Sequence, residues 1–357
     1  MSIVYLMEQN TTVSKEGGRL LIKKEGELSK TIHLFKLEQI VLFGNVFLTP
    51  AVIRHLLKEG IDTAFLTTKG KYLGRLQSAL GKNILLRREQ FRKMEDPEFC
   101  LKTAKAIVKG KLNNLRALLL RLNRSREDIE LENQILSLRN LITKLEEVDN
   151  LESLRGYEGR GTAVYFEGFS KGFLSEEIKF AGRVRRPPTD PINALLSLGY
   201  TLLLNQLIAS VSLVGFDPYF GTLHSMDYGR PSLALDLMEE WRPIIVDTLV
   251  LSVFNLKTIS LSDFEVRDEI IQKEEEEIGL NEDIQSHSSQ EKVKSVILTE
   301  AGFRKFITQF ERKMNQKVQY HLTGEQLTYR DCIREQVRHF ARYLKGEESQ
   351  YQPIPLK

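Results

Sequence analysis

One histidine and several carboxylates in the middle of this sequence are of the types that bind a divalent metal ion. Glu158 lies in the segment RGYEG (155–159), whose glycines predict a turn that lets a long acidic side chain point inward. His224 follows a glycine-containing loop, and Asp236 lies three and four residues before Glu239 and Glu240, on nearly the same helix face. Carboxylate oxygens suit Mg²⁺ and Mn²⁺, and an added imidazole shifts the preference toward Mn²⁺. These residues predict a site for Mg²⁺ or Mn²⁺.

Each of these residues also has an ordinary structural explanation. A glutamate near a glycine turn is commonly a surface or capping residue, and a single histidine is commonly a satisfied structural one. Acids in a helix that also holds Leu233 and Leu237 commonly form its solvated face. Spacing alone leaves both explanations open, and it does not choose among the three acids at 236, 239 and 240.

Two groups of arginines are candidates for contacts with DNA phosphates. Arg183 and Arg186 lie in a loop ahead of a long apolar segment, and Arg87 and Arg88 lie in a basic helical stretch. Arginine binds phosphate through charge-assisted, often bidentate, hydrogen bonds. The alternative for both groups is solvated charge at the start or on the surface of a helix.

Periodicity divides the chain into two domains that could position these residues. Residues 1–78 are rich in short runs of Ile, Val, Leu, Phe and Thr separated by turn residues, which predicts an antiparallel sheet or sandwich. Thr49, Pro50 and Gly60 predict one helix within that region. The spacing of apolar residues then changes from a period of two to a period of 3.6 across residues 79–96. We expect residues 79–96 to form a linker helix. The fold class expected is α+β.

The larger part of the chain, 97–345, is expected to be an all-α domain. Asp190 and Pro191 predict the start of a helix that is apolar nearly all round and extends to Val214, as a buried central helix would be. Residues 263–290 are acidic and rich in Ser and Gln, which predicts a mobile insertion. Residues 346–357 are expected to form an extended tail.

Composition limits the classes of function. The net charge of the 357 residues is +3, but residues 263–283 carry −8, so the remainder carries +11 and is compatible with a polyanionic partner. The sequence contains no run of about 18 uncharged apolar residues, so it gives no prediction of a membrane span. The N-terminus lacks the basic flank of a signal peptide, and two distant cysteines, Cys100 and Cys332, suit a reducing compartment. We expect a cytoplasmic protein that does not bind a membrane.

The order of several motifs resembles a known family. The motifs are GKYLGR (70–75), RREQ (87–90), LRGYEG (154–159), RRPPTDPINALLSLGY (185–200), LH (223–224), DYGRPSLALDLME (227–239) and YQPI (351–354). Together they resemble the CRISPR-associated integrase of spacer acquisition, the first-numbered Cas protein. The acidic 263–290 segment is longer than expected for a typical member.

This resemblance implies an N-terminal β-sandwich that mediates dimerisation and a C-terminal all-α catalytic domain. It implies a homodimer that assembles with a dimer of the second-numbered Cas protein. The family's metal ligands correspond to Glu158, His224 and Glu239, while Asp236 corresponds to a nearby acid that supports the site or is an alternative ligand. Arg155 and Arg230 correspond to basic residues near the scissile DNA.

The expected activity is that of a metal-dependent DNA endonuclease and integrase. A 3′-hydroxyl of a short double-stranded prespacer would attack a phosphodiester of the CRISPR repeat, with Mg²⁺ or Mn²⁺ as cofactor. Two alternatives stay open from the sequence. One is a non-catalytic architectural DNA-binding or adaptor protein, and the other is a related metal-dependent nuclease that cuts branched DNA in repair.

Overall fold

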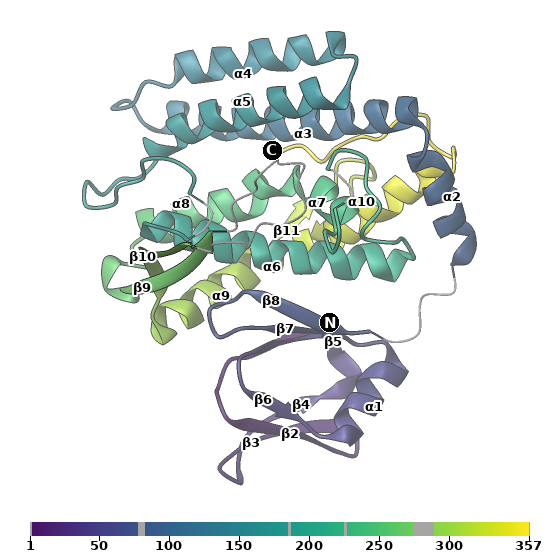
Figure 1. Ribbon diagram of the computed structural model, residues 1–357, viewed down its shortest axis with the longest axis vertical. Helices are drawn as coiled ribbons and strands as arrows, with labels where there is room; N and C mark the ends of the chain where they lie inside the picture. The colour runs from purple at the N-terminus through teal and green to yellow at the C-terminus, as the bar shows by residue number, and fades with distance from the viewer. Residues whose placement is uncertain (1, 78–82, 185–186, 225–226, 274–288, 357) are drawn as a thin grey trace.

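Two four-stranded sheets and a mostly helical body make up the computed structural model, which describes residues 2–77, 83–184, 187–224, 227–273 and 289–356 (Figure 1). The first sheet has the order β1 (Ser2–Leu6), β5 (Leu37–Phe43), β7 (Asp62–Leu66) and β8 (Tyr72–Leu76). The second has the order β4 (Glu27–His33), β3 (Arg19–Lys24), β2 (Thr11–Glu16) and β6 (Val46–Leu48).

The two sheets enclose an apolar core, which confirms the predicted β-sandwich. Val13 and Leu20 from the second sheet and Ile40 from the first are fully buried in one cluster. The sheets are mixed and not purely antiparallel, since β1, β5 and β7 run parallel and β6 is parallel to β2. The predicted helix is present as α1 (Pro50–Glu59), and Gly60 ends it in the left-handed conformation with φ +67°.

The strands β2 and β6 were not predicted. β2 has the sequence TTVSKE, so only its alternate residues Thr11 and Val13 are buried and its apolar signal is weak. β6 has three residues, which is too short for a periodicity to be recognised.

Helices form most of the remaining chain and confirm the α+β class. After α2 (Ile84–Met94), the long α3 (Pro97–Ser125) packs with α4 (Glu132–Lys144) and α5 (Leu151–Ser170). Below these lie α6 (Pro191–Val214), α7 (Ser232–Met238), a π-helical turn at Arg242–Asp247 and α8 (Thr248–Asn255) (Figure 1). The chain continues through α9 (Glu300–Met314) and α10 (Tyr329–Leu344).

The predicted central helix is present as α6. Asp190 caps its N-terminus by accepting a hydrogen bond from the Asn193 backbone N–H, at 2.8 Å. Within the described part of the chain, α6 is the only helix long and apolar enough to cross a membrane, and 72% of its most apolar stretch is buried inside the protein. The core of this domain therefore accounts for its hydropathy.

The helical domain is not all-α, because it contains two hairpins. One pairs β11 (Lys317–Gln319) with β12 (Gln326–Thr328), and the other pairs β9 (Phe264–Lys273) with β10 (Ser289–Leu298). The second hairpin corrects the prediction that all of 263–290 is a mobile insertion. The acidic composition suggested disorder, but β9 and β10 pair so that opposite charges face each other, as at Asp268 and Lys294. Residues 274–288 lie outside the described residues.

The first sheet also packs against the helical domain. Its residue Phe43 meets Phe303 of α9 edge to face, with ring centroids 5.0 Å apart. Gln206 of α6 donates a hydrogen bond to Gln39 of β5 at 2.5 Å. β5 is therefore buried on both faces, which explains its continuous apolar run. The predicted boundaries of the domains and the dimerising role of the sandwich stay predictions.

Candidate metal centre

A loop wraps around the buried carboxylate of Asp236. Its Oδ2 accepts hydrogen bonds from the backbone N–H groups of Thr222 and Leu223, at 2.6 and 2.9 Å, and its Oδ1 accepts one from the N–H of His224 at 3.0 Å. Gly221 makes this wrap possible, because a Cβ there would lie 2.6 Å from Asp236 Oδ2 and 2.7 Å from the backbone of Ser232. Asp236 is fully buried and its oxygens are saturated with donors.

Asp236 also orients the imidazole of His224. Its Oδ1 lies 2.6 Å from Nδ1 of that ring, so Nδ1 carries the proton when the imidazole is neutral. The other nitrogen, Nε2, then has a free lone pair and lies 3.9 Å from Glu239 Oε1. In this arrangement Asp236 orients a candidate ligand, and both of its oxygens already accept hydrogen bonds.

Glu239 lies where α7 passes into the π-helical turn, and it is 3% exposed. Arg242, one turn on, reaches its Oε1 at 3.2 Å, and Lys111 Nζ lies 2.6 Å from its Oε2. Burial alone would raise the pKa of Glu239, but Arg242 and Lys111, helped by His224, hold that pKa at about 2. The carboxylate is therefore ionised throughout the physiological range of pH.

Glu158 is in the middle of α5 and not in a turn, which corrects the sequence-based prediction. Gly156 and Gly159, which flank it, have open space beside them, whereas the later glycines of α5 serve helix packing. A Cβ at Gly161 would collide with Leu112 of α3, and one at Gly168 would lie 3.0 Å from Leu119. The glycines let α5 approach α3 closely, and Glu158, three residues before Gly161, lies on the same face of α5.

Lys111 of α3 joins the two glutamates. Its ammonium is ion-paired with Glu158 Oε1 as well as with Glu239 Oε2, and its side chain is 6% exposed. Thr162 donates a further hydrogen bond to Glu158 Oε1 at 3.1 Å. A cation thus already lies between two of the three predicted ligands, with the third close to Glu239.

The donor set is suited to a divalent metal ion, although no three His, Cys, Asp or Glu side chains of the described residues lie close enough together to hold one. The ammonium of Lys111 separates Glu158 from Glu239. Glu239 Oε2 is occupied by the ammonium of Lys111 at 2.6 Å, so a metal ion could bind this oxygen only in place of that ammonium. Two carboxylates and one neutral imidazole form a set that Mg²⁺ and especially Mn²⁺ accept. The residues fit the metal once Lys111 moves aside.

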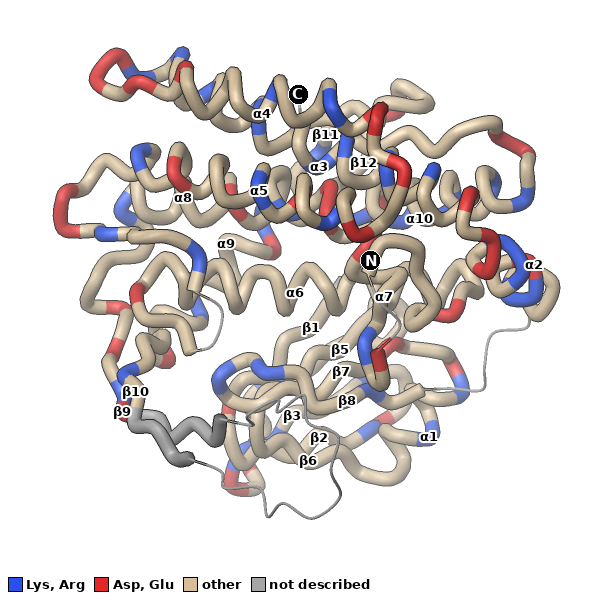
Figure 2. The backbone as a smooth tube through the Cα atoms, turned by 45° about the horizontal axis from the view of Figure 1, so that its top comes forward, with Lys and Arg blue, Asp and Glu red and all other residues tan. Residues whose placement is uncertain are grey.

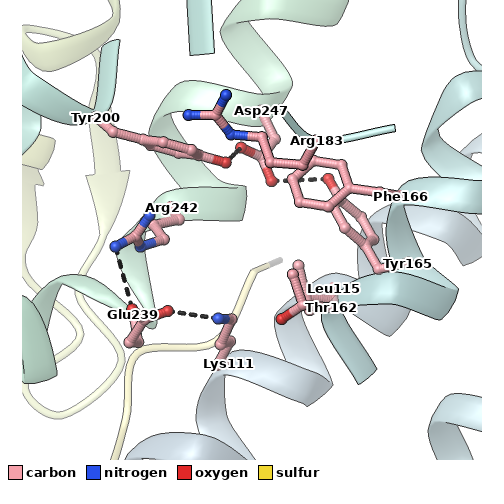
Figure 3. A pocket seen from close by; sticks show the side chains of 10 residues that line it. All are labelled: Lys111, Leu115, Thr162, Tyr165, Phe166, Arg183, Tyr200, Glu239, Arg242 and Asp247. Carbon is pink, nitrogen blue, oxygen red and sulfur yellow. Dashed lines mark hydrogen bonds and ion pairs between the residues drawn. The ribbon is translucent and has the colours of Figure 1, made fainter. Parts of the chain in front are cut away.

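A cavity of about 40 Å³ adjoins Glu239, and Figure 3 shows the side chains that line it. Asp247 accepts hydrogen bonds there from Tyr165 at 2.8 Å and Tyr200 at 2.6 Å. Burial raises the pKa of Asp247 to about 6, against the effect of the two hydroxyl donors. The guanidinium of Arg242 stacks over the ring of Tyr200, 4.7 Å from its centroid. Buried polar groups therefore continue from the carboxylate centre into the core.

The predicted DNA-contacting arginines lie at different places around this centre. Arg155 donates to the carbonyl oxygen of Leu223 at 2.7 Å, next to His224, and Arg183 lines the cavity. Arg230 pairs with Asp227 at 2.8 Å on the loop before α7. Two more, Arg87 and Arg88, lie on α2, where Figure 2 shows basic positions. Arg186 lies outside the described residues.

Sequence reasoning missed the buried cations of the site. Lys111 lies four residues after Ile107 and four before Leu115, within the apolar stripe of α3. A lysine on such a stripe needs a buried partner. Arg242 and Asp247 carry the same signal, because they interrupt the buried segment around the π-helical turn.

Comparison with known proteins agrees with the fold and identifies the family. A model of the family described as CRISPR associated protein Cas1 matches residues 4–282. A relative named CRISPR-associated endonuclease Cas1 3, from Thermus thermophilus, is 34% identical over 359 residues, which cover 100% of this chain and 98% of that protein.

Solved structures share the architecture. A casposase bound to integration product has a TM-score of 0.81 and 26% identity, with 99% of this chain and 93% of that chain covered. A chain of a Cas6-RT-Cas1–Cas2 complex has a TM-score of 0.79 at 24% identity, and the match covers 100% of this chain but 36% of that longer chain. The family model and the full-length relative together show that this chain belongs to the CRISPR-associated Cas1 family of endonucleases and integrases.

Proposed function

We propose that this chain is a metal-dependent DNA integrase, with Glu158, His224 and Glu239 as the ligands of Mg²⁺ or Mn²⁺. The observation that carries the proposal is the arrangement of two carboxylates around one buried ammonium, with the free Nε2 of an oriented imidazole beside them. Carboxylate oxygens together with an imidazole nitrogen are donors that a divalent cation accepts.

The reaction is a transesterification. The 3′-hydroxyl oxygen of a prespacer strand attacks phosphorus of the repeat DNA and loses its proton, and the bond from phosphorus to the 3′-oxygen of the repeat strand breaks and leaves a new 3′-hydroxyl. Because one phosphodiester replaces another, no nucleotide cofactor is needed. The metal would supply Lewis acidity toward the attacking hydroxyl and the phosphate oxygens.

The protein residues have separate roles in this reaction. Asp236 keeps His224 in the tautomer that has Nε2 free, and the ionised Glu239 provides negative charge without needing to lose a proton. Lys111, Arg242 and Arg183 supply positive charge close to the carboxylates, where a phosphate would need it.

The partners follow from the same proposal. The substrate would be double-stranded DNA, both as prespacer and as CRISPR repeat, held in part by Arg155, Arg230, Arg87 and Arg88. The casposase structure contains an integration product, and another structural neighbour is a complex with Cas2, which support a DNA substrate and a Cas2 dimer as partner. We also propose that the chain forms a homodimer and acts in the cytoplasm.

Strand transfer by a single variant tests the site assignment. Glu158→Gln keeps the size and the Thr162 contact but removes one negative charge. We expect the folded variant to bind branched DNA with unchanged affinity and to lose transfer of a labelled prespacer in Mn²⁺. Glu146→Gln, at an exposed glutamate that also pairs with a lysine, is the matched control. Full activity of Glu158→Gln would reject the assignment.

A further inference from the structure

Residues 351–356 follow α10 as an extended segment that lies across the helical domain, and we call it the clamp segment. Figure 1 shows the yellow end of the chain passing beside α3. Its residues Tyr351 and Ile354 are 4% and 5% exposed, which is unusual for an extended segment without a sheet partner. Its interactions are made with the end of α7, with α3 and with α10.

The first attachment is Glu240, the residue directly after Glu239. Its Oε1 accepts a hydrogen bond from the Tyr351 hydroxyl at 2.5 Å, and its Oε2 accepts one from the backbone N–H of Ile354 at 2.7 Å. Glu240 is 1% exposed. Without the clamp segment its carboxyl group would lose these two donors inside the core, where an unsatisfied buried polar group is destabilising.

The second attachment is the face of α3 beside Lys111. Asn114 accepts a hydrogen bond from the Leu356 N–H at 2.7 Å, and its amide donates to the carbonyl oxygens of Ile354 at 2.8 Å and Glu240 at 3.0 Å. One turn earlier, a Cβ at Gly110 would collide with the ring of Pro353. The glycine therefore provides the space in which the proline packs.

A third helix anchors the start of the segment. His339 of α10 accepts a hydrogen bond from the Gln352 N–H at 2.8 Å, and Gln336 donates to the Tyr351 hydroxyl at 3.0 Å and to the carbonyl oxygen of Gln352 at 2.8 Å. The segment thus links α10 to α3 and to the end of α7.

We infer that the clamp segment is a positioning device for the catalytic centre. Glu239 and Lys111 come from parts of the chain more than a hundred residues apart, and their 2.6 Å contact depends on the placement of α3 against the end of α7. The clamp segment hydrogen-bonds to Glu240, the neighbour of Glu239, and on α3 it packs against Gly110, the neighbour of Lys111, and hydrogen-bonds to Asn114. Its removal leaves the ligands present but lets the two helices shift relative to each other.

A chain that ends at Gln350 tests this inference, which rests on the proposed function for its activity readout. We expect the shortened chain to fold, to bind DNA with unchanged affinity and to transfer strands about 10- to 100-fold more slowly at saturating DNA, since a displacement of about 1 Å can cost that much. A synthetic peptide of residues 351–357 should restore the rate when it is added to the shortened chain, and the same peptide with Tyr351→Phe should restore less.

Gly110→Leu in the shortened chain is the specificity control, because leucine is a good helix former that fills the space for Pro353. The peptide should not rescue that variant. An unchanged rate in the shortened chain, or a slow rate that the peptide cannot restore, would overturn the inference. A full-length chain without strand transfer would reject the proposed function instead. The clamp would then be judged by whether the peptide restores slow amide hydrogen exchange around 236–241 of the shortened chain.

Discussion

Replacement of Lys111 by methionine removes the cation that separates two carboxylates. Methionine has nearly the same length and fills the same space, so the change isolates the charge. In the wild type, the side chain of Lys111 is 6% exposed and contacts both Glu158 and Glu239. If a divalent ion is to be held by these carboxylates, the ammonium must leave them. We therefore predict that Lys111→Met lowers stability without metal and raises the affinity for Mn²⁺.

The size of both effects follows from the ion pairs. Breaking a buried pair from one side costs about 3–5 kcal/mol, because the partner charge stays buried. Glu158 is partly exposed, at 25% for its side chain, so the lower end of that range applies. About 3 kcal/mol corresponds to a fall in Tm of several degrees without metal. The same energy, no longer needed to displace the ammonium, would tighten Mn²⁺ binding by about a hundredfold.

Thermal unfolding during a Mn²⁺ titration, together with calorimetric measurement of the Mn²⁺ Kd, measures both effects. A ligand that binds the native state stabilises it by RT ln(1 + [L]/Kd), so saturating Mn²⁺ should raise the Tm of Lys111→Met more than that of the wild type. Lys109→Met is the matched control, since this lysine of the same helix is 49% exposed and pairs with Glu146. Equal Mn²⁺ affinity in Lys111→Met and the wild type would refute the displacement argument.

Three further predictions concern neighbouring residues. Asp236→Asn should leave the chain folded but weaken Mn²⁺ binding about 10- to 100-fold in calorimetry, because His224 loses the carboxylate that sets its tautomer. Arg230→Ala should weaken DNA binding and reduce the slope of log K against log salt by about 1, whereas an unchanged slope would argue against a phosphate contact. Asp247 has a folded pKa of about 6, above its usual 3.8, so the stability that its protonated form contributes is complete below about pH 4 and is lost as pH rises through 6. Relative to Asp247→Asn, the wild type should therefore lose about 2 kcal/mol of unfolding free energy between pH 4 and 7 in denaturant titrations.

The parts of the fold that could be predicted from the sequence are those with a strong local signal. Pro50 and Gly60 mark the ends of α1, and Asp190 marks the start of α6. The hairpin of β9 and β10 was missed because its sequence carries no strong local signal. Its first strand belongs to a segment whose charge suggests disorder, and its pairing depends on a partner strand more than fifteen residues away. Composition describes an average over a segment, whereas a strand ladder depends on which residues face each other.

The sequence singled out the acids and the histidine of the candidate centre but not its cations. The resemblance to a family selected Glu158, His224 and Glu239, and the structure places His224 and Glu239 close together with Glu158 one ammonium away. The resemblance gives no information about the residues that hold these side chains in place. Lys111 and Arg242 become visible only when their burial is known, because a basic residue in a helix is ordinarily solvated.

The position of Glu158 nevertheless has a signature in the sequence, once the glycines around it are considered as a set. Gly161 and Gly168 are spaced by seven residues, which places them on one face of α5, and Glu158 precedes the first by three; Gly172 follows just beyond the end of that helix. Glycines that mark a turn cluster without such a period, while glycines that mark close helix packing repeat with it. In the structure, each of the three would carry its Cβ into a leucine of α3 or α8. The period therefore indicates that the acid lies inside a helix interface, where only a paired or metal-bound carboxylate is stable.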